Sequence, residues 1–163
     1  MRHGPAEDRG PSGGDFDRPL SGAGSVVVRR VAEELRKQHP AELPRILASP
    51  LRRAQQTAAL VRSVTGWSAE VESYNELSGS IVPVDLALEL GRGQDDVLLV
   101  GHQPTLEDLV HRLAAPASRA PAPAASRAVR LVDGFCTAMV VVLRTGEPSS
   151  PWSIEAIVDP RRL

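Results

Sequence analysis

Three short segments, far apart in the sequence, bring histidine and arginine together: Arg2-His3-Gly4, Ser49 to Ala54 with Thr57, and Gly101-His102. An arginine side chain suits a phosphoryl group, because its planar guanidinium donates paired hydrogen bonds and keeps its charge at any relevant pH. A neutral imidazole can attack phosphorus and hold the phosphoryl group covalently, which splits one transfer into two steps. Neighbouring arginines would keep that imidazole unprotonated, because they disfavour a further positive charge. The residue types therefore indicate phosphoryl transfer.

Each segment also has an explanation that involves no chemistry, and His3 could simply be a solvent-exposed residue near the terminus. His102 could cap the helix that follows it, and Arg52 with Arg53 could form a solvated helix face. Spacing alone does not separate Arg52 from Arg53 as the anion ligand. His39 and His111 match no motif, and we interpret both as surface residues of helices. The prediction of a site depends on the three segments being present together.

Two of the segments follow predicted strands. Residues 45–48 form a short β-like run before Ser49, and the apolar run 97–100 before Gly101 is typical of a strand that is buried on both faces. In a parallel sheet the ligand site lies just outside the carboxyl ends of the strands. The segments that begin at Ser49 and Gly101 therefore lie where a ligand site is expected.

The same two segments open predicted helices. Ser49 is the expected N-cap of one helix, with Pro50 at its first position. Thr105 is the expected N-cap of the other, with Asp108 completing a capping box. Free N–H groups at such helix starts favour an anion.

The remaining elements follow from periodicity and from breaker residues. They are an exposed loop over 5–19, a helix from the N-cap Ser21 to His39-Pro40, a helix from 51 to about 64, a strand around 70–73, a loop over 75–80, a helix over 84–90, a flexible Ala/Pro-rich loop over 114–128, and strands over 129–132, 137–143 and 152–158. Strands alternating with helices predict an α/β fold, a three-layer α/β/α sandwich with a mostly parallel central sheet. Its length suits a single domain over residues 1–163.

Composition excludes several classes of partner. A formal charge of −1 and 3% aromatic residues offer no basic or base-stacking surface for nucleic acid. The longest apolar run, 138–143, is too short to span a membrane, and no apolar signal segment opens the chain. The single cysteine, Cys136, suits a reducing compartment. We therefore expect a cytoplasmic protein without membrane or nucleic-acid partners, and without a cofactor or metal, since no metal-ligand spacing is present.

Other phosphatase chemistries fit the sequence poorly. A cysteine nucleophile needs an arginine six residues later, but Val142 follows Cys136 at that distance. Asp15-Phe16-Asp17 is similar to an aspartate-nucleophile motif, yet no buried strand precedes it. No Gly-rich loop ends in Lys-Ser or Lys-Thr.

The three segments resemble, in order, the signatures of the histidine phosphatase superfamily, which has the phosphoglycerate mutase-like fold. Short length, the segment 17–21 with Gly24, and Pro104 after His102 narrow the resemblance to SixA-type phosphohistidine phosphatases. The resemblance covers essentially the whole chain.

The resemblance implies a role for each matched residue. His3 would be the nucleophile, and Arg2, Arg53 and His102 would hold the phosphoryl oxygens. Arg53 is preferred because the family pattern places its arginine directly before alanine. The other candidate substrate contacts are Arg18, Gly4 and Arg52.

A general acid is harder to find. Glu76 follows the second segment, where larger members of the superfamily carry a carboxylic acid, and a solvated loop carboxylate explains it equally well. SixA-type enzymes manage without such an acid, which is reasonable because a phosphorylated imidazole has a better leaving group than an alkyl phosphate.

The resemblance implies a metal-independent phosphatase that acts on a histidine-phosphorylated signalling or phosphotransfer protein. The sequence does not determine the oligomeric state, and a monomer is the favoured expectation. The alternatives are a phosphatase of small phosphomonoesters, with Glu76 as acid, and a phospho-binding module without catalysis.

In this superfamily the Arg-His-Gly motif ends a central strand, but only Met1 precedes it here. We therefore expect the first strand to be truncated by about five residues.

Overall fold

The centre of the fold is a parallel sheet of three strands, in a computed structural model that describes residues 1–43, 45–79, 96–114, 134–144 and 152–163. Strand β1 (Arg45–Ala48) lies between β2 (Val71–Ser73) and β3 (Val97–Val100). Both neighbours run parallel to β1, so the carboxyl ends of all three strands lie at one edge. Strands β4 (Val140–Arg144) and β5 (Ser153–Val158) pair antiparallel as a second sheet.

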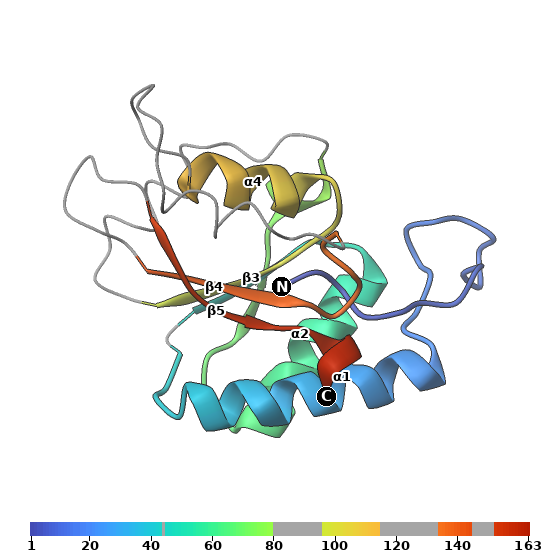
Figure 1. The fold of residues 1–163 in the computed structure, drawn as a ribbon. Coiled ribbons are helices and arrows are strands. Elements are labelled where there is room, and N and C mark those ends of the chain that lie inside the picture. The colour runs from blue at the N-terminus through green and yellow to red at the C-terminus, as the bar shows by residue number, and fades with distance from the viewer. Residues whose placement is uncertain (44, 80–95, 115–133, 145–151) are drawn as a thin grey trace.

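Helices cover both sides of these strands, as Figure 1 shows. Helices α1 (Gly22–Gln38) and α2 (Arg52–Thr65) pack together on one side, and α4 (Thr105–Ala114) lies on the other. Two short 3-10 helices, η1 (Asn75–Ser78) and η2 (Pro160–Arg162), follow β2 and β5. This arrangement confirms the predicted three-layer α/β fold. In the described ranges, no helix has the length and hydropathy that crossing a bilayer requires.

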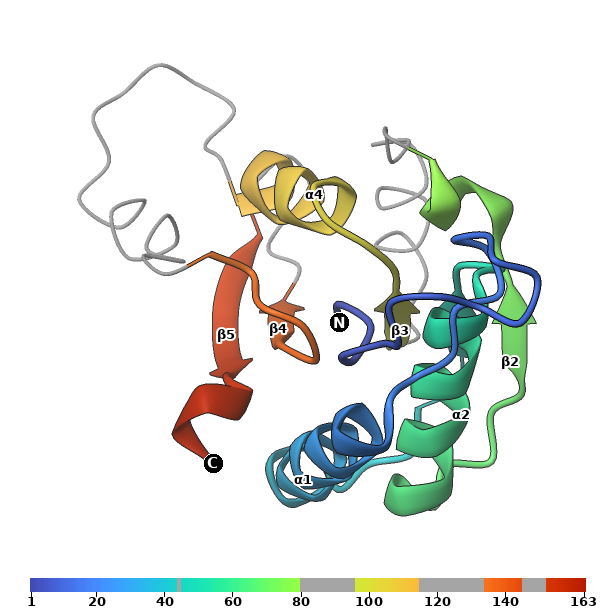
Figure 2. The same ribbon diagram turned by 90° about the vertical axis from the view of Figure 1, so that its right-hand side faces the viewer.

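The first three residues connect the two sheets, and Figure 2 shows the N-terminus between β3 and β4. On one side, Gly101 N–H donates to the Met1 carbonyl at 3.1 Å, and His3 N–H donates to the Gly101 carbonyl at 3.0 Å. On the other side, Arg2 N–H donates to the Met139 carbonyl, and Ala138 N–H donates to the His3 carbonyl, both at 3.0 Å. His3 is therefore held from both directions at the edge where the parallel strands end.

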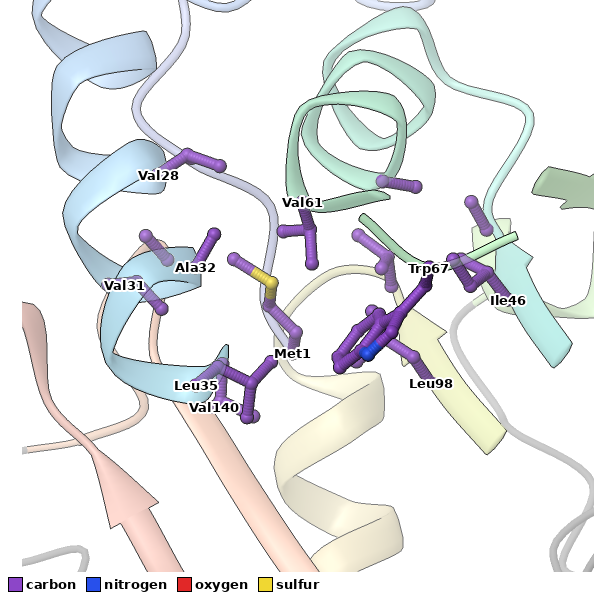
Figure 3. Packing of buried hydrophobic residues seen from close by; sticks show 14 of the residues in the cluster. Met1, Val28, Val31, Ala32, Leu35, Ile46, Val61, Trp67, Leu98 and Val140 are labelled. Carbon is purple, nitrogen blue, oxygen red and sulfur yellow. The ribbon is translucent and has the colours of Figure 1, made fainter. Parts of the chain in front are cut away.

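The hydrophobic core fixes these first residues further. Met1 is 5% exposed and packs among apolar side chains of α1, α2, β1, β3 and β4 (Figure 3). Two glycines also allow close packing around this segment. A Cβ on Gly4 would lie 2.5 Å from Val28 Cγ2, and one on Gly24 would lie 2.0 Å from the Pro5 carbonyl oxygen. Only glycine therefore lets the start of α1 approach the segment that follows His3 this closely.

Most predicted elements are confirmed where the structure describes them. The predicted strands 45–48 and 97–100 match β1 and β3, and β2 and β5 start within a residue of their predicted positions. The Ser21 hydroxyl accepts from Gly24 N–H at 2.9 Å and caps α1, which ends at His39. Residues 5–19 are a largely exposed loop, as predicted.

The predicted N-caps were wrong at two helices. Helix α2 begins at Arg52 with Leu51 at its N-cap position, and the Ser49 hydroxyl lies 2.7 Å from His102 Nε2 instead. Thr105 lies inside α4, and its hydroxyl donates to the Gly79 carbonyl at 2.8 Å. The Ser49 hydroxyl accepts from Leu51 N–H at 3.3 Å as well as lying against His102, whereas the Thr105 hydroxyl donates only to its tertiary partner among the described residues.

Three further predictions need correction. Strand β4 begins at Val140 rather than at residue 137, because Ala138 has a positive φ of 66° that strand geometry does not allow. The predicted loop 75–80 contains η1. Strand β3 is fully buried on one face only, since Val97 and Leu99 on the other face are half-buried against side chains of α4. The predicted helix 84–90, strand 129–132 and all of loop 114–128 beyond Ala114 lie outside the described residues.

Candidate active site

One ring nitrogen of His3 is unprotonated and faces Arg53. Its Nδ1 lies 2.7 Å from the Gly4 carbonyl oxygen. A carbonyl only accepts hydrogen bonds, so Nδ1 must carry the proton and Nε2 must carry the electron pair. Arg53 Nε–H donates to that Nε2 at 3.2 Å. The backbone thus sets the tautomer that a nucleophilic histidine needs.

Arg53 is fixed at the start of α2 by contacts with Asp15. The Arg53 side chain is 8% exposed, and its NH2 donates to Asp15 Oδ2 at 3.0 Å. Its NH1 donates to the Asp15 backbone carbonyl at 2.8 Å. The other carboxylate oxygen of Asp15 accepts from Arg18 NH1 at 2.8 Å. A single carboxylate therefore bridges two arginines next to His3.

His102 lies beside His3, with ring centroids 4.9 Å apart and ring planes at 54°. Its Nε2 is 2.7 Å from the Ser49 hydroxyl, which also accepts from Leu51 N–H at 3.3 Å. Its Nδ1 is buried without a hydrogen-bond partner among the described residues. If the Ser49 hydroxyl donates to Nε2, the proton of His102 is on Nδ1, where it is free for a ligand.

Arg2 contributes another buried nitrogen without a hydrogen-bond partner among the described residues, in addition to Nδ1 of His102. Its NH1 donates to the side-chain oxygen of Gln103 and to the Phe135 carbonyl at 2.8 Å. Gln103 in turn donates to Glu107 at 2.7 Å. Arg2 Nε is buried and unpaired within the part of the chain that the structure describes. Buried donors rarely remain unsatisfied in native proteins, so this nitrogen and His102 Nδ1 are suited to an anionic ligand.

The electrostatic environment keeps both histidines neutral at pH 7. Burial, with smaller contributions from the charges of Arg53 and Arg2, lowers the pKa of His3 to about 4. Burial and then the charges of His3 and Arg53 lower the pKa of His102 to about 4 as well. Burial also lowers the pKa of Arg2. An unprotonated His3 can act as a nucleophile at physiological pH.

The structure brings together some of the residues predicted from sequence and leaves others apart. His3, Arg53 and His102 come together, with Arg2 and Arg18 close enough for their charges to act on His3. Gly4 N–H donates to the Thr57 hydroxyl at 3.1 Å and so supports the motif by backbone contact. The structure also distinguishes the two adjacent arginines, because Arg53 is buried at the site and Arg52 is exposed.

Glu76 and Arg52 stay outside this cluster. Glu76 is exposed on η1, and neither side chain makes a hydrogen bond or an ion pair with a described residue. Sequence reasoning missed Asp15, Ser49 and Gln103 as contacts of the site. The available signal for Asp15 is its position three residues before Arg18. Over the described ranges, no three His, Cys, Asp or Glu side chains cluster closely enough to hold a metal ion.

Comparisons with known proteins test the motifs and the fold. Residues 1–79 match the sequence pattern of the histidine phosphatase superfamily, branch 1. No curated protein matches the chain. Among solved structures, the protein histidine phosphatase SixA complexed with tungstate has 26% identity and a TM-score of 0.77, over 99% of this chain and 96% of that one.

Two further SixA structures are similar over nearly the whole chain. The SixA protein from Agrobacterium tumefaciens has 23% identity and a TM-score of 0.76, over 98% of this chain and 95% of its own. The SixA protein from Nakamurella multipartitia has 25% identity and a TM-score of 0.74, over 98% and 93%. The resemblance inferred from the motifs is therefore confirmed: residues 1–79 carry the sequence pattern of the histidine phosphatase superfamily, and the chain has the fold of SixA proteins.

Proposed function

We propose that this protein is a phosphatase that removes the phosphoryl group from a phosphorylated histidine of another protein. One observation carries the proposal: Nε2 of the neutral, half-buried His3 is unprotonated and lies 3.2 Å from Nε of the buried Arg53. The Gly4 carbonyl holds the ring in this orientation. Comparison with the SixA structures supports the same class of substrate.

The reaction has two steps. His3 Nε2 attacks phosphorus, the bond from phosphorus to the substrate nitrogen breaks, and its electron pair stays on the leaving imidazole. Water then attacks the phosphorus on His3, the Nε2–phosphorus bond breaks, and inorganic phosphate leaves while Nε2 recovers its electron pair. Arg53, Arg2 Nε–H and His102 Nδ1–H would bind the phosphoryl oxygens and stabilise charge in both transition states.

The state of the nearby carboxylates favours a phosphohistidine over an alkyl phosphate. An alkoxide leaves poorly without a proton donor. Glu76 makes no contact with the histidines, and hydrogen bonds from Arg18 and Arg53 lower the pKa of Asp15, so that its carboxylate is ionised and cannot donate a proton. An imidazole leaving group has less need of one.

The test is detection of the covalent intermediate. Rapid quenching during turnover of a histidine-phosphorylated phosphotransfer domain should trap an acid-labile phosphoryl group on His3. His3→Ala should abolish both the adduct and turnover. His111→Ala is the matched control, because it removes a histidine from α4 that makes no hydrogen bond with the described residues, and it should retain both.

Other outcomes would contradict the proposal. Turnover without any adduct on His3 would rule out the covalent mechanism. Faster turnover of sugar phosphates than of the phosphorylated protein, lost in Glu76→Gln, would indicate a small-ester phosphatase. Binding of a phosphohistidine peptide without phosphate release would indicate a binding module.

A further inference from the structure

Asp15 occupies the hydrogen-bonding positions of an anion on the arginines of the site. Its two carboxylate oxygens accept from Arg53 at 3.0 Å and from Arg18 at 2.8 Å. Carboxylate and phosphoryl oxygens are equivalent ligands for a guanidinium, because both fit the same planar set of donors. Arg53 is 8% exposed whereas the Asp15 side chain is 61% exposed, so the arginine is fixed and the carboxylate covers it from the solvent side.

The negative charge of Asp15 also reaches the rest of the site. It raises the pKa of His102, against the lowering effects of burial and of the nearby cations. A phosphoryl group between His3, His102 and Arg53 would therefore bind within the field of this carboxylate. Like charges that share a site disfavour each other, so the anion has to displace the carboxylate or bind against its repulsion.

The chain around Asp15 is anchored at its base and exposed along its length. Ala6 pairs with Leu20 in an antiparallel bridge, and Glu7 N–H donates to the Pro19 carbonyl at 2.9 Å. Within the loop, Asp17 accepts from Ser12 N–H at 2.7 Å. A partner that touches this loop can therefore act on Asp15 without disturbing the buried strand ends.

We propose that Asp15 is a specificity-determining residue: it competes with anions for Arg53 and Arg18 and so sets a low affinity for free phosphate. The inference rests on the proposed function, since it takes the arginines beside His3 as the phosphoryl site. A phosphorylated protein contacts more of the surface than phosphate does, and this additional binding energy can offset displacement of the carboxylate. Free phosphate has no such contacts, so the site would favour a macromolecular substrate and release its product.

The experiment measures binding of inorganic phosphate and tungstate by calorimetry in Asp15→Asn, which removes the charge but keeps the size. We expect binding roughly three- to tenfold tighter than in the unchanged protein, the size of a partly exposed ion pair. Asp15→Glu keeps the charge and should stay within about threefold of the unchanged protein. Asp8→Asn is the matched control, because Asp8 is an exposed carboxylate of the same loop without a hydrogen bond to a described residue, and its effect should stay below about twofold.

The opposite results would overturn the inference. Weaker binding in Asp15→Asn, in a protein with an unchanged melting temperature, would show that Asp15 positions Arg53 for the anion. Equal affinity would show that the carboxylate does not compete. Either result together with an intact His3 adduct contradicts only this inference. If neither anion binds the unchanged protein and no adduct forms, the proposed function itself fails.

Discussion

The inner and outer sides of the candidate site are built differently. On the inner side, His3 is held by backbone hydrogen bonds and His102 by the buried Ser49 hydroxyl at the ends of β1 and β3, and Arg53 is buried in the first turn of α2. On the outer side, Asp15 and Arg18 lie on a largely exposed loop and form a direct ion pair at 2.8 Å, and Asp15 also accepts from Arg53. Buried contacts leave a side chain little freedom, whereas exposed ion pairs contribute little energy and yield to a ligand. Side chains held in fixed positions suit catalysis, and exposed side chains that can move suit discrimination among the ligands that enter the site.

The sharpest test of this difference uses two adjacent arginines, of which only Arg53 faces inward. Arg53→Ala should lower kcat/KM for the phosphorylated protein by about 10²- to 10³-fold, because a donor to the developing phosphoryl charge is lost. Arg52→Ala should lower it by no more than about threefold, since its side chain is exposed and its charge is screened by solvent. Steady-state kinetics on both variants decide this. Equal losses of kcat/KM in the two variants would mean that the buried arginine contributes no more to catalysis than the exposed one.

A second test compares two glycines at the start of α1. Gly24→Ala should destabilise the protein by about 2–3 kcal/mol, because the new Cβ would meet the Pro5 carbonyl oxygen and overpack the contact. Gly22→Ala has no atom within 4 Å of its added Cβ and should be neutral or stabilising by about 0.5 kcal/mol. Urea unfolding gives both values. A stable Gly24→Ala protein would mean that this contact does not constrain the segment after His3.

The smallest expected effect is on pH dependence near neutrality. Because His3 and His102 have pKa values of about 4 in the folded protein, kcat/KM should lose little between pH 7 and pH 5 through the histidine pair and fall as pH approaches 4. The unfolded chain binds more protons than the folded one between about pH 6.5 and pH 4. The free energy of unfolding should therefore decrease as pH falls through that window.

Histidine resonances followed by NMR, together with pH-rate profiles, check this expectation. Apparent midpoints between pH 6 and 7 for the pair would contradict it, because they would mean that solvent reaches both rings. The same samples in urea give the ordinary histidine titration as a reference.

Much of the inner side could be predicted from the sequence. Arg2-His3, Arg53 and Gly101-His102 stand in motifs with local strand and helix signals, and the carboxyl ends of parallel strands bring such segments together. The preference for Arg53 over Arg52 came from the family pattern, and the helical twist explains it physically, since adjacent helix residues point about 100° apart.

The outer side could not be predicted in the same way. The contact of Asp15 with Arg53 joins residues 38 positions apart, and no periodicity encodes it. Two contacts on the inner side and beside it are missed for the same reason: local rules assign Ser49 and Thr105 to helix caps because they consider only neighbours along the chain. Their hydroxyls bond to His102 and to the Gly79 carbonyl, which only the folded chain brings near. At both positions a tertiary partner bonds to a hydroxyl that local rules assign to the helix start alone.

The backbone of Met1–His3 bonds on one side to the strand end at Gly101 and on the other to Ala138 and Met139. His3, the proposed nucleophile, therefore lies in the segment that joins the two sheets, so any movement of one sheet against the other also moves its backbone. Amide hydrogen exchange at Gly101 and Ala138 would report directly on how rigidly His3 is aimed. Motion that breaks these hydrogen bonds would misalign His3 Nε2 for the proposed attack on phosphorus.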